Sequence, residues 1–366
     1  MKPALFINDL QKGGAERLVK DIATELANEE SVSPIVVVGN PTGELLKEFK
    51  ESAVPLYSLD VEITPRGLPV AARRLAKLLE DLDVDLVHSH LAFSHVVSRI
   101  ACARSSIEHI STYHNVRSHK SLPKRITERV TEPLTNQCVC VSEGVRQTFP
   151  DGEDMEVIYN AIAVEEFNKR VAIADRPNVI TELDDDTFVL LNVARCVEQK
   201  RQEDLVEAMA HLDSDAVHLF IVGDGPRRQY IEDVVKERDL EDSVTVTGYV
   251  EAVEPYYAIA DAFVSSSENE GLPTTHIEAS AAGLPIASTN IPGVTEVVSE
   301  GETGSLSPVD SPRKMAETIK SIREGDPQKM GKSGLKKVQN EFSIGSIVAD
   351  HLRLYQDVCY GISSTD

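Results

Sequence analysis

The fold class follows from one stretch of sequence, residues 188–226, which reads FVLLNVARCVEQKRQEDLVEAMAHLDSDAVHLFIVGDGP. Two apolar runs of strand length, 188–194 and 217–222, flank a polar loop and a segment with helical periodicity. A strand, a helix and a second strand in this order form a β-α-β unit, in which the two strands lie parallel in one sheet. The stretch therefore predicts an α/β fold with parallel strands.

The same alternation of strand-length and helical segments runs through most of the chain. In the first half, strands are predicted at 4–7, 34–38, 84–88, 109–113, 137–141 and 155–159, and helices between them at 15–27 and 68–82. We interpret the polar stretch 168–186 as a linker, after which the series resumes with strands at 188–194 and within 217–223, 243–250, 261–266 and 284–289. We therefore expect two Rossmann-like domains, 1–167 and 187–342, followed by an amphipathic helix at 343–360.

The chain is strongly acidic. Its 366 residues include 60 Asp and Glu against 37 Lys and Arg, which gives a formal net charge of −23. Such a charge repels phosphate backbones, so nucleic acid is excluded as a partner. Because the acidic residues are spread along the chain, a salt-adapted host and an ordinary acidic bacterial protein both remain open.

The sequence also bears on location and redox state. No apolar run reaches the roughly 18 residues of a membrane span, and the first apolar stretch ends at Asp9, too early for a secretory signal. We therefore expect a cytoplasmic protein. The five cysteines contain no C-x-x-C pair, so we expect reduced thiols rather than disulfides or a zinc site.

Glycines and cations follow several predicted strands, at the edge where an open parallel sheet binds ligands. Gly13 and Gly14 open a helix whose N–H groups favour anionic or oxygen-rich ligands, although a tight turn explains the pair equally well. Arg195 and Lys200 can straddle a diphosphate, with a solvated ion pair as the alternative. Gly223 belongs to the turn V-G-D-G-P, which either lines a ligand with backbone or is purely structural.

The most informative motif contains Glu270 and Glu278, which are separated by seven residues. Gly271 and Pro273 mark a loop that turns into a helix, so N–H groups around 272–275 can face a ligand. Two carboxylates with this spacing can accept hydrogen bonds from separate hydroxyls, as sugar and ribose rings require. The motif therefore indicates a site for a sugar-containing ligand.

Together these motifs resemble those of the retaining glycosyltransferases of family 4, which have the two-domain GT-B architecture. The resemblance covers nearly the whole chain, and the motifs occur in the family's order, from G-G-A-E-R at 13–17 to N-I-P-G-V-T-E at 290–296. It implies two domains facing across a cleft: an acceptor-side domain at 1–167, to which the C-terminal crossover helix 343–360 returns, and a nucleotide-sugar-binding domain at 187–342. It also implies retaining transfer of a hexose or N-acetylhexosamine from a nucleotide-diphosphate-sugar, with UDP favoured over GDP, to a glycan or lipid-linked acceptor.

The resemblance further implies roles for individual residues. Arg195 and Lys200 would neutralise the donor diphosphate, and Glu278 would hold the ribose hydroxyls. Glu270 would hold the donor sugar, and His114, in T-Y-H-N at 112–115, matches the family's active-site histidine. The implied catalytic residues are His114, Arg195, Lys200 and Glu270. The implied donor-binding residues are Gly13, Gly14, Arg195, Lys200, Gly223, Tyr249, Val250, Glu270, Gly271, Leu272, Pro273, Thr274 and Glu278.

Three positions depart from the family pattern. Arg201 and Ala161 stand where glycine is usual, and Thr274 follows Pro273 in place of a larger or amide residue. These departures leave the reaction class intact and the donor sugar open.

The implied reaction needs neither a metal ion nor another cofactor, because cations and helix N-termini can stabilise the leaving diphosphate. Two patterns mimic metal sites. The D-x-D-like residues 81, 83 and 85 precede a predicted strand instead of following it, and His88-x-His90 lacks further ligands nearby. We interpret the three aspartates as a solvated helix end and strand start, and the two histidines as buried or cleft side chains rather than metal ligands.

A basic segment interrupts the acidic chain between residues 115 and 130, where Glu128 is the only acidic residue. Its five basic residues are Arg117, Lys120, Lys124, Arg125 and Arg129. We hypothesise that this surface docks on anionic lipid at the inner face of the cell membrane, with a solvated helix as the alternative. A sugar-nucleotide epimerase of GT-B-like fold and a non-catalytic nucleotide-sugar-binding protein remain the rival functions.

Overall fold

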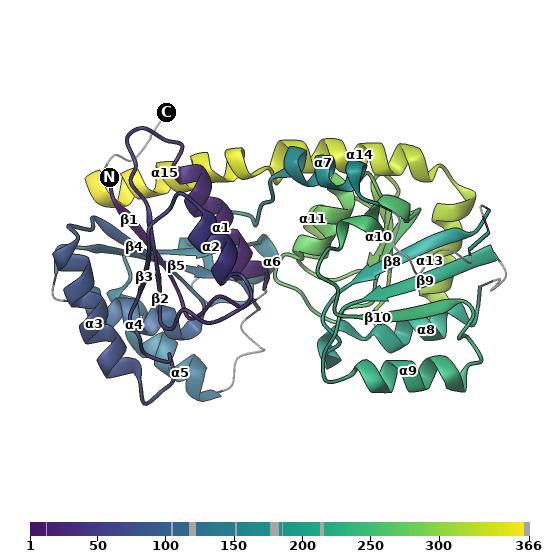
Figure 1. Ribbon diagram of the computed structural model, residues 1–366, viewed down its shortest axis with the longest axis horizontal. Coiled ribbons are helices and arrows are strands. Elements are labelled where there is room, and N and C mark those ends of the chain that lie inside the picture. The colour runs from purple at the N-terminus through teal and green to yellow at the C-terminus, as the bar shows by residue number, and fades with distance from the viewer. Residues whose placement is uncertain are drawn as a thin grey trace. The chain divides into compact units, whose positions relative to one another are not determined.

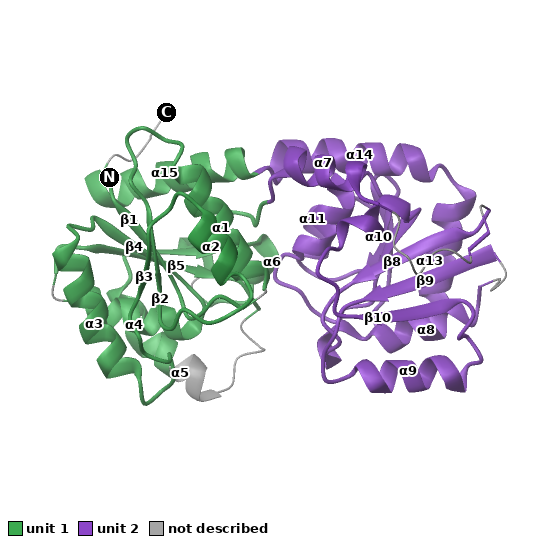
Figure 2. Cartoon of the chain, in the orientation of Figure 1, with its two compact units in different colours: residues 1–161, 344–366 green, residues 162–343 purple. Residues whose placement is uncertain are grey.

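The computed structural model describes residues 1–11, 13–103, 105–116, 122–150, 152–175, 183–184, 186–212 and 216–361, with the backbone alone at 122–126. The chain divides into two compact units (Figure 2). Unit 1 comprises Met1–Ala161 with Ile344–Asp366, and unit 2 comprises Ile162–Ser343. Each unit is built on one β-sheet covered by helices, as the ribbon in Figure 1 shows.

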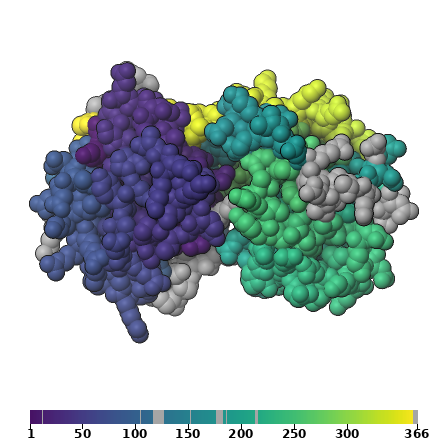
Figure 3. Space-filling view, in the orientation of Figure 1, coloured from purple at the N-terminus to yellow at the C-terminus, as the bar shows by residue number. Residues whose placement is uncertain are grey.

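Unit 1 contains a seven-stranded sheet in the order β3-β2-β1-β4-β5-β6-β7, and every pairing in it is parallel. Its strands are β1 (Pro3–Ile7), β2 (Ile35–Val38), β3 (Leu56–Ser58), β4 (Leu86–His90), β5 (Glu108–Tyr113), β6 (Gln137–Cys140) and β7 (Glu156–Val157). Residues of β1 and β2 are buried from end to end. The space-filling view of Figure 3 shows one face of the molecule, coloured along the chain.

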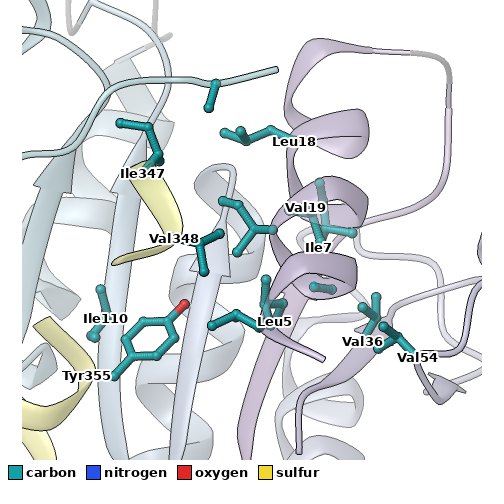
Figure 4. Packing of buried hydrophobic residues seen from close by; sticks show 14 of the residues in the cluster. Leu5, Ile7, Leu18, Val19, Val36, Val54, Ile110, Ile347, Val348 and Tyr355 are labelled. Atoms are coloured by element: carbon teal, nitrogen blue, oxygen red, sulfur yellow. The ribbon is translucent and has the colours of Figure 1, made fainter. Parts of the chain in front are cut away.

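Helices cover both faces of this sheet. They are α1 (Gly14–Leu26), α2 (Leu46–Glu51), α3 (Leu68–Asp81), α4 (Ala92–Cys102), α5 (Leu122–Thr131), α6 (Glu143–Arg146) and α15 (Ile344–Tyr360). On one face, Leu18 of α1 and Ile347 and Tyr355 of α15 join Leu5 of β1 in a buried cluster (Figure 4). Helices α3 and α4 contribute to the cluster on the other face. The last helix of the chain is thus part of the core of unit 1.

Unit 2 contains a six-stranded parallel sheet in the order β10-β9-β8-β11-β12-β13. Its strands are β8 (Phe188–Val193), β9 (Val217–Val222), β10 (Val244–Gly248), β11 (Ala262–Ser265), β12 (Ile286–Thr289) and β13 (Gly304–Ser307). Its helices are α7 (Val164–Ile173), α8 (Gln202–Met209), α9 (Arg228–Glu237), α10 (Glu254–Ile259), α11 (Thr274–Ala281), α12 (Val294–Val297), α13 (Pro312–Glu324) and α14 (Pro327–Glu341). Apolar residues of α8, α9 and α13 pack on one face, and Tyr257 of α10 stacks on Phe263 of β11 on the other.

The predicted α/β class is confirmed, and both sheets have the doubly wound strand order of Rossmann folds. In each sheet the order reverses between two neighbouring strands, β1 and β4 in unit 1 and β8 and β11 in unit 2. Ligands of such sheets bind beside the carboxyl ends of the strands at this point of reversal. We therefore expect ligand sites beside the loops that follow β1, β4, β8 and β11.

The boundary between the units differs from the expected one at residue 167. The first segment of unit 1 ends at Ala161, and residues 164–173 of the expected first domain and linker form α7 of unit 2. The reason is packing, because Phe167 of α7 lies edge-on against Tyr257 with their ring centroids 5.3 Å apart. A second difference concerns β4, which begins later than predicted and includes both His88 and His90.

Candidate active site on the second sheet

The loops that follow β8, β9 and β10 are joined by backbone hydrogen bonds. Cys196 N–H donates to Asp224 O at 3.0 Å, and Gly223 N–H donates to Gly248 O at 3.0 Å. Gly223 has a φ of +143°, and a Cβ at this position would overlap the carbonyl oxygen of Ala194. The V-G-D-G-P turn therefore has a structural role, which is to hold the loop that carries Arg195.

Arg195 and Lys200 lie on the loop between β8 and α8. The Arg195 side chain is exposed, while its carbonyl accepts a hydrogen bond from Gln202 Nε2 at 3.0 Å. Lys200 ends a short 3₁₀ turn, Glu198–Lys200, and its carbonyl accepts from Ser266 Oγ at 3.0 Å. The loop is thereby fixed to the segment that follows β11.

Arg201 explains one departure from the family pattern. Its φ of 47° is left-handed, a conformation that favours glycine. The guanidinium pairs with Asp204 at 2.7 Å and also with Asp310. These ion pairs stabilise the folded state and offset part of the free-energy cost of placing a non-glycine residue at this φ.

The central feature of the site is an ion pair between residues from two different loops. Lys200 Nζ lies 2.5 Å from Glu270 Oε1, and Ser267 Oγ donates to the same carboxylate oxygen at 2.7 Å. The side chains are largely buried, with 22% of Lys200 and 9% of Glu270 exposed. An ammonium has three N–H donors, so Lys200 can meet anionic oxygens while it stays paired with Glu270.

The loop before α11 is held from three sides. Gln199 Nε2 donates to Asn269 O at 2.8 Å, and Thr289 Oγ1 donates to Ser267 O at 2.6 Å. Gly293, with a φ of +82°, lies so close to the Gly271 carbonyl that a Cβ would overlap it. The loop leads into the N-terminus of α11, where backbone N–H groups lack helical partners.

Leu272, Pro273 and Thr274 form the start of α11, with Pro273 as its N-cap residue. His276 follows on the first turn, and its Nε2 lies 2.9 Å from Ser288 Oγ. Burial, together with the nearby charge of Lys200, lowers the pKa of His276 to about 3. His276 is therefore neutral near pH 7, and the positive charge beside it is that of Lys200.

Glu278 is oriented by a tyrosine of the neighbouring helix. Tyr257 OH donates to Glu278 Oε2 at 3.0 Å. Burial and the adjacent Glu278 carboxylate raise the pKa of Tyr257, so the phenol keeps its proton and remains a donor. At the end of β10, Val250 is half-buried and the Tyr249 ring is 57% exposed, which suits an aromatic that stacks on a planar group.

In unit 1 the predicted residues also follow strands. Gly13 caps α1 and Gly14 is its first residue, directly after the loop from β1. His114 comes directly after β5, and its Nε2 lies 3.0 Å from Nδ1 of His90, the last residue of β4. Sequence reasoning treated His90 as a buried or cleft histidine and missed this contact. Residues at alternate positions of neighbouring parallel strands share a face, which is the signal that could have indicated it.

The basic segment is described only in part. Arg117 and Lys120 lie outside the described residues, as do the side chains of Lys124 and Arg125, whose backbone belongs to α5. Arg129 is exposed near the end of α5.

Across the described ranges, no helix is long and apolar enough to cross a membrane. No group of three or more His, Cys, Asp or Glu side chains there is arranged to hold a metal ion. The D-x-D-like segment at 81–85 has a structural contact, because the Asp85 carboxylate accepts from the backbone N–H of Lys2 at 2.7 Å.

Two family models match the chain. Residues 12–166 match Glycosyltransferase Family 4, and residues 176–337 match Glycosyl transferases group 1. N-acetyl-alpha-D-glucosaminyl L-malate synthase from Bacillus anthracis is 25% identical over 325 residues, which are 85% of this chain and 84% of the relative.

Similarity to other relatives spans the chain. N-acetylgalactosamine-N,N'-diacetylbacillosaminyl-diphospho-undecaprenol 4-alpha-N-acetylgalactosaminyltransferase from Campylobacter jejuni is 24% identical over 374 residues, covering 96% of this chain and 98% of the relative. The crystal structure of Anabaena HepE with UDP and glucose superposes with a TM-score of 0.83 at 18% identity, covering 97% of this chain and 99% of that chain. The two family models together with the fold show that this chain belongs to the family 4 glycosyltransferases, which have the GT-B fold.

Proposed function

We propose that this glycosyltransferase moves a hexose or N-acetylhexosamine from a UDP-sugar to a glycan or lipid-linked acceptor, with retention of configuration and without a metal ion. The observation that carries the proposal is the Lys200–Glu270 ion pair, which lies beside the point of strand reversal in the second sheet. A cation and a carboxylate held side by side suit a ligand that joins a diphosphate to a sugar.

The relatives support the proposed substrate classes. HepE has been crystallised with UDP and glucose, and the Campylobacter jejuni relative is named after a saccharide on diphospho-undecaprenol. The Bacillus anthracis relative is named N-acetyl-alpha-D-glucosaminyl L-malate synthase. The second molecule in these names differs between the relatives. We therefore propose a specific class of donor, a UDP-sugar, and a broader class of acceptor, a glycan or a lipid-linked molecule.

The proposed chemistry follows from the charge that develops on the leaving group. As the acceptor hydroxyl oxygen forms a bond to C1 of the sugar, the bond between C1 and the diphosphate oxygen breaks, and the hydroxyl proton passes to the diphosphate or to water. The electron pair of the broken bond stays on the diphosphate, which gains negative charge as the bond breaks. Lys200, Arg195 and the N–H groups at the start of α11 stabilise this charge. Glu270 Oε1 is occupied by Lys200 and Ser267, so Oε2 is the atom we assign to a hydroxyl of the donor sugar.

Ligand binding tests the nucleotide part of the proposal. Thermal unfolding is measured with UDP, GDP, UDP-glucose, UDP-N-acetylglucosamine and GDP-mannose, because a ligand that binds the folded state raises the unfolding temperature. We expect UDP and its sugars to give the larger shifts. Lys200→Ala should weaken UDP binding at least about tenfold, since a charge-assisted hydrogen bond contributes about 1.5–3 kcal/mol. Lys320→Ala, on the exposed side of α13, is the control. Equal affinity in both variants would rule out Lys200 as a diphosphate ligand.

Product analysis tests the reaction itself. With donor and acceptor present, the anomeric configuration of the product is read by NMR, and transfer is compared with and without EDTA. An inverted product would contradict retention, and loss of transfer in EDTA would contradict metal independence. Isomerisation of the donor without an acceptor would instead indicate an epimerase.

We also propose that the basic segment at 115–130 contacts anionic lipid at the inner face of the cell membrane. The support is its charge, which is opposite to that of the chain as a whole, because basic residues near an anionic surface contribute about 1 kcal/mol each. Co-sedimentation with vesicles that contain phosphatidylglycerol should therefore exceed that with neutral phosphatidylcholine vesicles. Equal recovery with both would reject the contact.

A further inference from the structure

Two histidines of unit 1 meet at the carboxyl ends of β4 and β5. The parallel register pairs His90 with Thr112, which brings His114, two residues further on, to the side of the His90 ring. His90 Nδ1 lies 3.0 Å from His114 Nε2. Their ring centroids are 5.2 Å apart.

The His90 ring is held in place by its surroundings. It is fully buried, and its centroid lies 4.3 Å from that of His88. His88 is itself fixed, because its two nitrogens lie 2.6 Å from Tyr355 OH and 2.6 Å from Thr112 Oγ1. A ring packed against such a neighbour cannot easily turn to exchange its two nitrogens.

The other nitrogen of His90, Nε2, is buried and has no hydrogen-bond partner among the residues that the structure describes. Burial, with smaller contributions from His88 and His114, holds the pKa of His90 well below its usual value. The ring is therefore neutral near pH 7 and carries a single N–H.

The contact between the two rings needs one N–H and one lone pair, which allows two arrangements. If His114 donated from Nε2, His90 would carry its proton on Nε2, where a buried N–H would have no acceptor. If His90 donates from Nδ1, the atom left without a partner is an acceptor. Buried N–H groups without partners are rarer in proteins than buried acceptors without partners, which favours the second arrangement.

We propose that His90 is a positioning residue: it donates from Nδ1 to His114 Nε2 and so holds His114 in the tautomer that carries its proton on Nδ1. The proton of His114 is then on Nδ1, the ring nitrogen that does not face His90. This inference rests on the proposed function in one respect, which is that His114 contacts the donor sugar.

Nitrogen NMR of histidine-labelled protein tests the tautomer directly, with the His114 signals assigned through His114→Gln. The full chain is used. We expect His114 to carry its proton on Nδ1 in the wild type and in His90→Asn, because the asparagine amide can donate from about the position of Nδ1. In His90→Phe, which has no donor, His114 should change to the Nε2–H tautomer that predominates for histidine in water. An Nε2–H tautomer in the wild type, or an Nδ1–H tautomer that persists in His90→Phe, would overturn the proposal.

Transfer kinetics provide the second measurement. Loss of an aligned neutral hydrogen bond should lower kcat of His90→Phe about tenfold, with KM for the donor within about twofold, and His90→Asn should retain kcat within about threefold. If His90→Phe does not fold, the wild-type spectrum and His90→Asn still decide the question. Undiminished transfer by His114→Ala would reject the role of His114 in the proposed function and leave the tautomer assignment intact.

Discussion

Acid should destabilise unit 1 in part through a buried histidine on the last helix, His351. His351 is 3% exposed, its Nδ1 lies 3.0 Å from Ile347 O, and its ring lies beside those of His88 and Tyr355. Burial lowers the pKa of His351 from 6.5 to about 4. The folded state therefore favours the neutral ring. Its contribution to stability is complete above pH 6.5 and is lost as the pH falls towards 4, because the unfolded chain binds the proton first.

The size of the effect follows from the two pKa values. Between about pH 7.5 and about pH 5, the unfolded state gains nearly a full proton at this position and the folded state gains almost none. Linkage converts this difference to a loss of about 2 kcal/mol in the free energy of unfolding. Other buried histidines add to the acid loss of the wild type, so the contribution of His351 must be measured as a difference between variants.

The assay is urea unfolding of the wild type, His351→Leu and His211→Gln at both pH values. Circular dichroism reports the whole chain, and hydrogen exchange of the β1 amides reports unit 1. His211→Gln is the control because His211 is exposed. Whatever its stability at neutral pH, His351→Leu should lose about 2 kcal/mol less than the wild type on acidification. An equal loss in all three proteins would refute the reasoning.

Three further predictions concern the second unit and the whole chain. Gly293→Ala and Gly283→Ala both place a side chain at a left-handed φ, which costs about 1–2 kcal/mol, but only at Gly293 would the Cβ overlap the Gly271 carbonyl. Urea unfolding and UDP titration should show the larger stability loss and weaker binding for Gly293→Ala, and identical behaviour would contradict the proposed support of the loop. Tyr257→Phe removes the hydrogen bond to Glu278 and should weaken UDP binding up to about tenfold by calorimetry, with unchanged affinity as the contrary result. The net charge of −23 predicts an unfolding temperature that rises from about 0.1 M to about 2 M KCl, and a flat profile would remove the salt-adapted interpretation.

Hydrophobic periodicity predicted most strands of both sheets because buried parallel strands are apolar on both faces. The stretch 188–194 became β8, ending within one residue of the predicted end. The stretch 155–159 formed only Glu156–Val157 of β7, since an edge strand has one neighbour and its length depends on that pairing. Residues 168–173 of α7 were assigned to a linker because the packing partner of this helix, Tyr257, lies far along the chain.

For the site, the sequence predicted both halves of the central ion pair but not their contact. Lys200 and Glu270 are 70 residues apart, and they meet because β8 and β11 are neighbours in the sheet. Strand order depends on long-range pairing, which the period of apolar residues does not encode. The contacts of Tyr257 with Glu278 and of His90 with His114 were missed for the same reason. In each pair the two residues belong to different elements, which only the fold brings together.

The position of α15 has a consequence for the order in which the protein can fold during synthesis. Unit 2 is continuous in sequence, whereas unit 1 needs residues from both ends of the chain. At about 5–20 residues per second, about 10–40 s pass between the synthesis of Ala161 and that of the last turn of α15. During this interval the face of the first sheet that Tyr355 and Ile347 will cover is exposed on the nascent chain. Emergence of α15 from the ribosome, rather than completion of the first sheet, is therefore the step at which unit 1 acquires its full core. Until then, chaperones that recognise apolar surface can bind this face of the sheet.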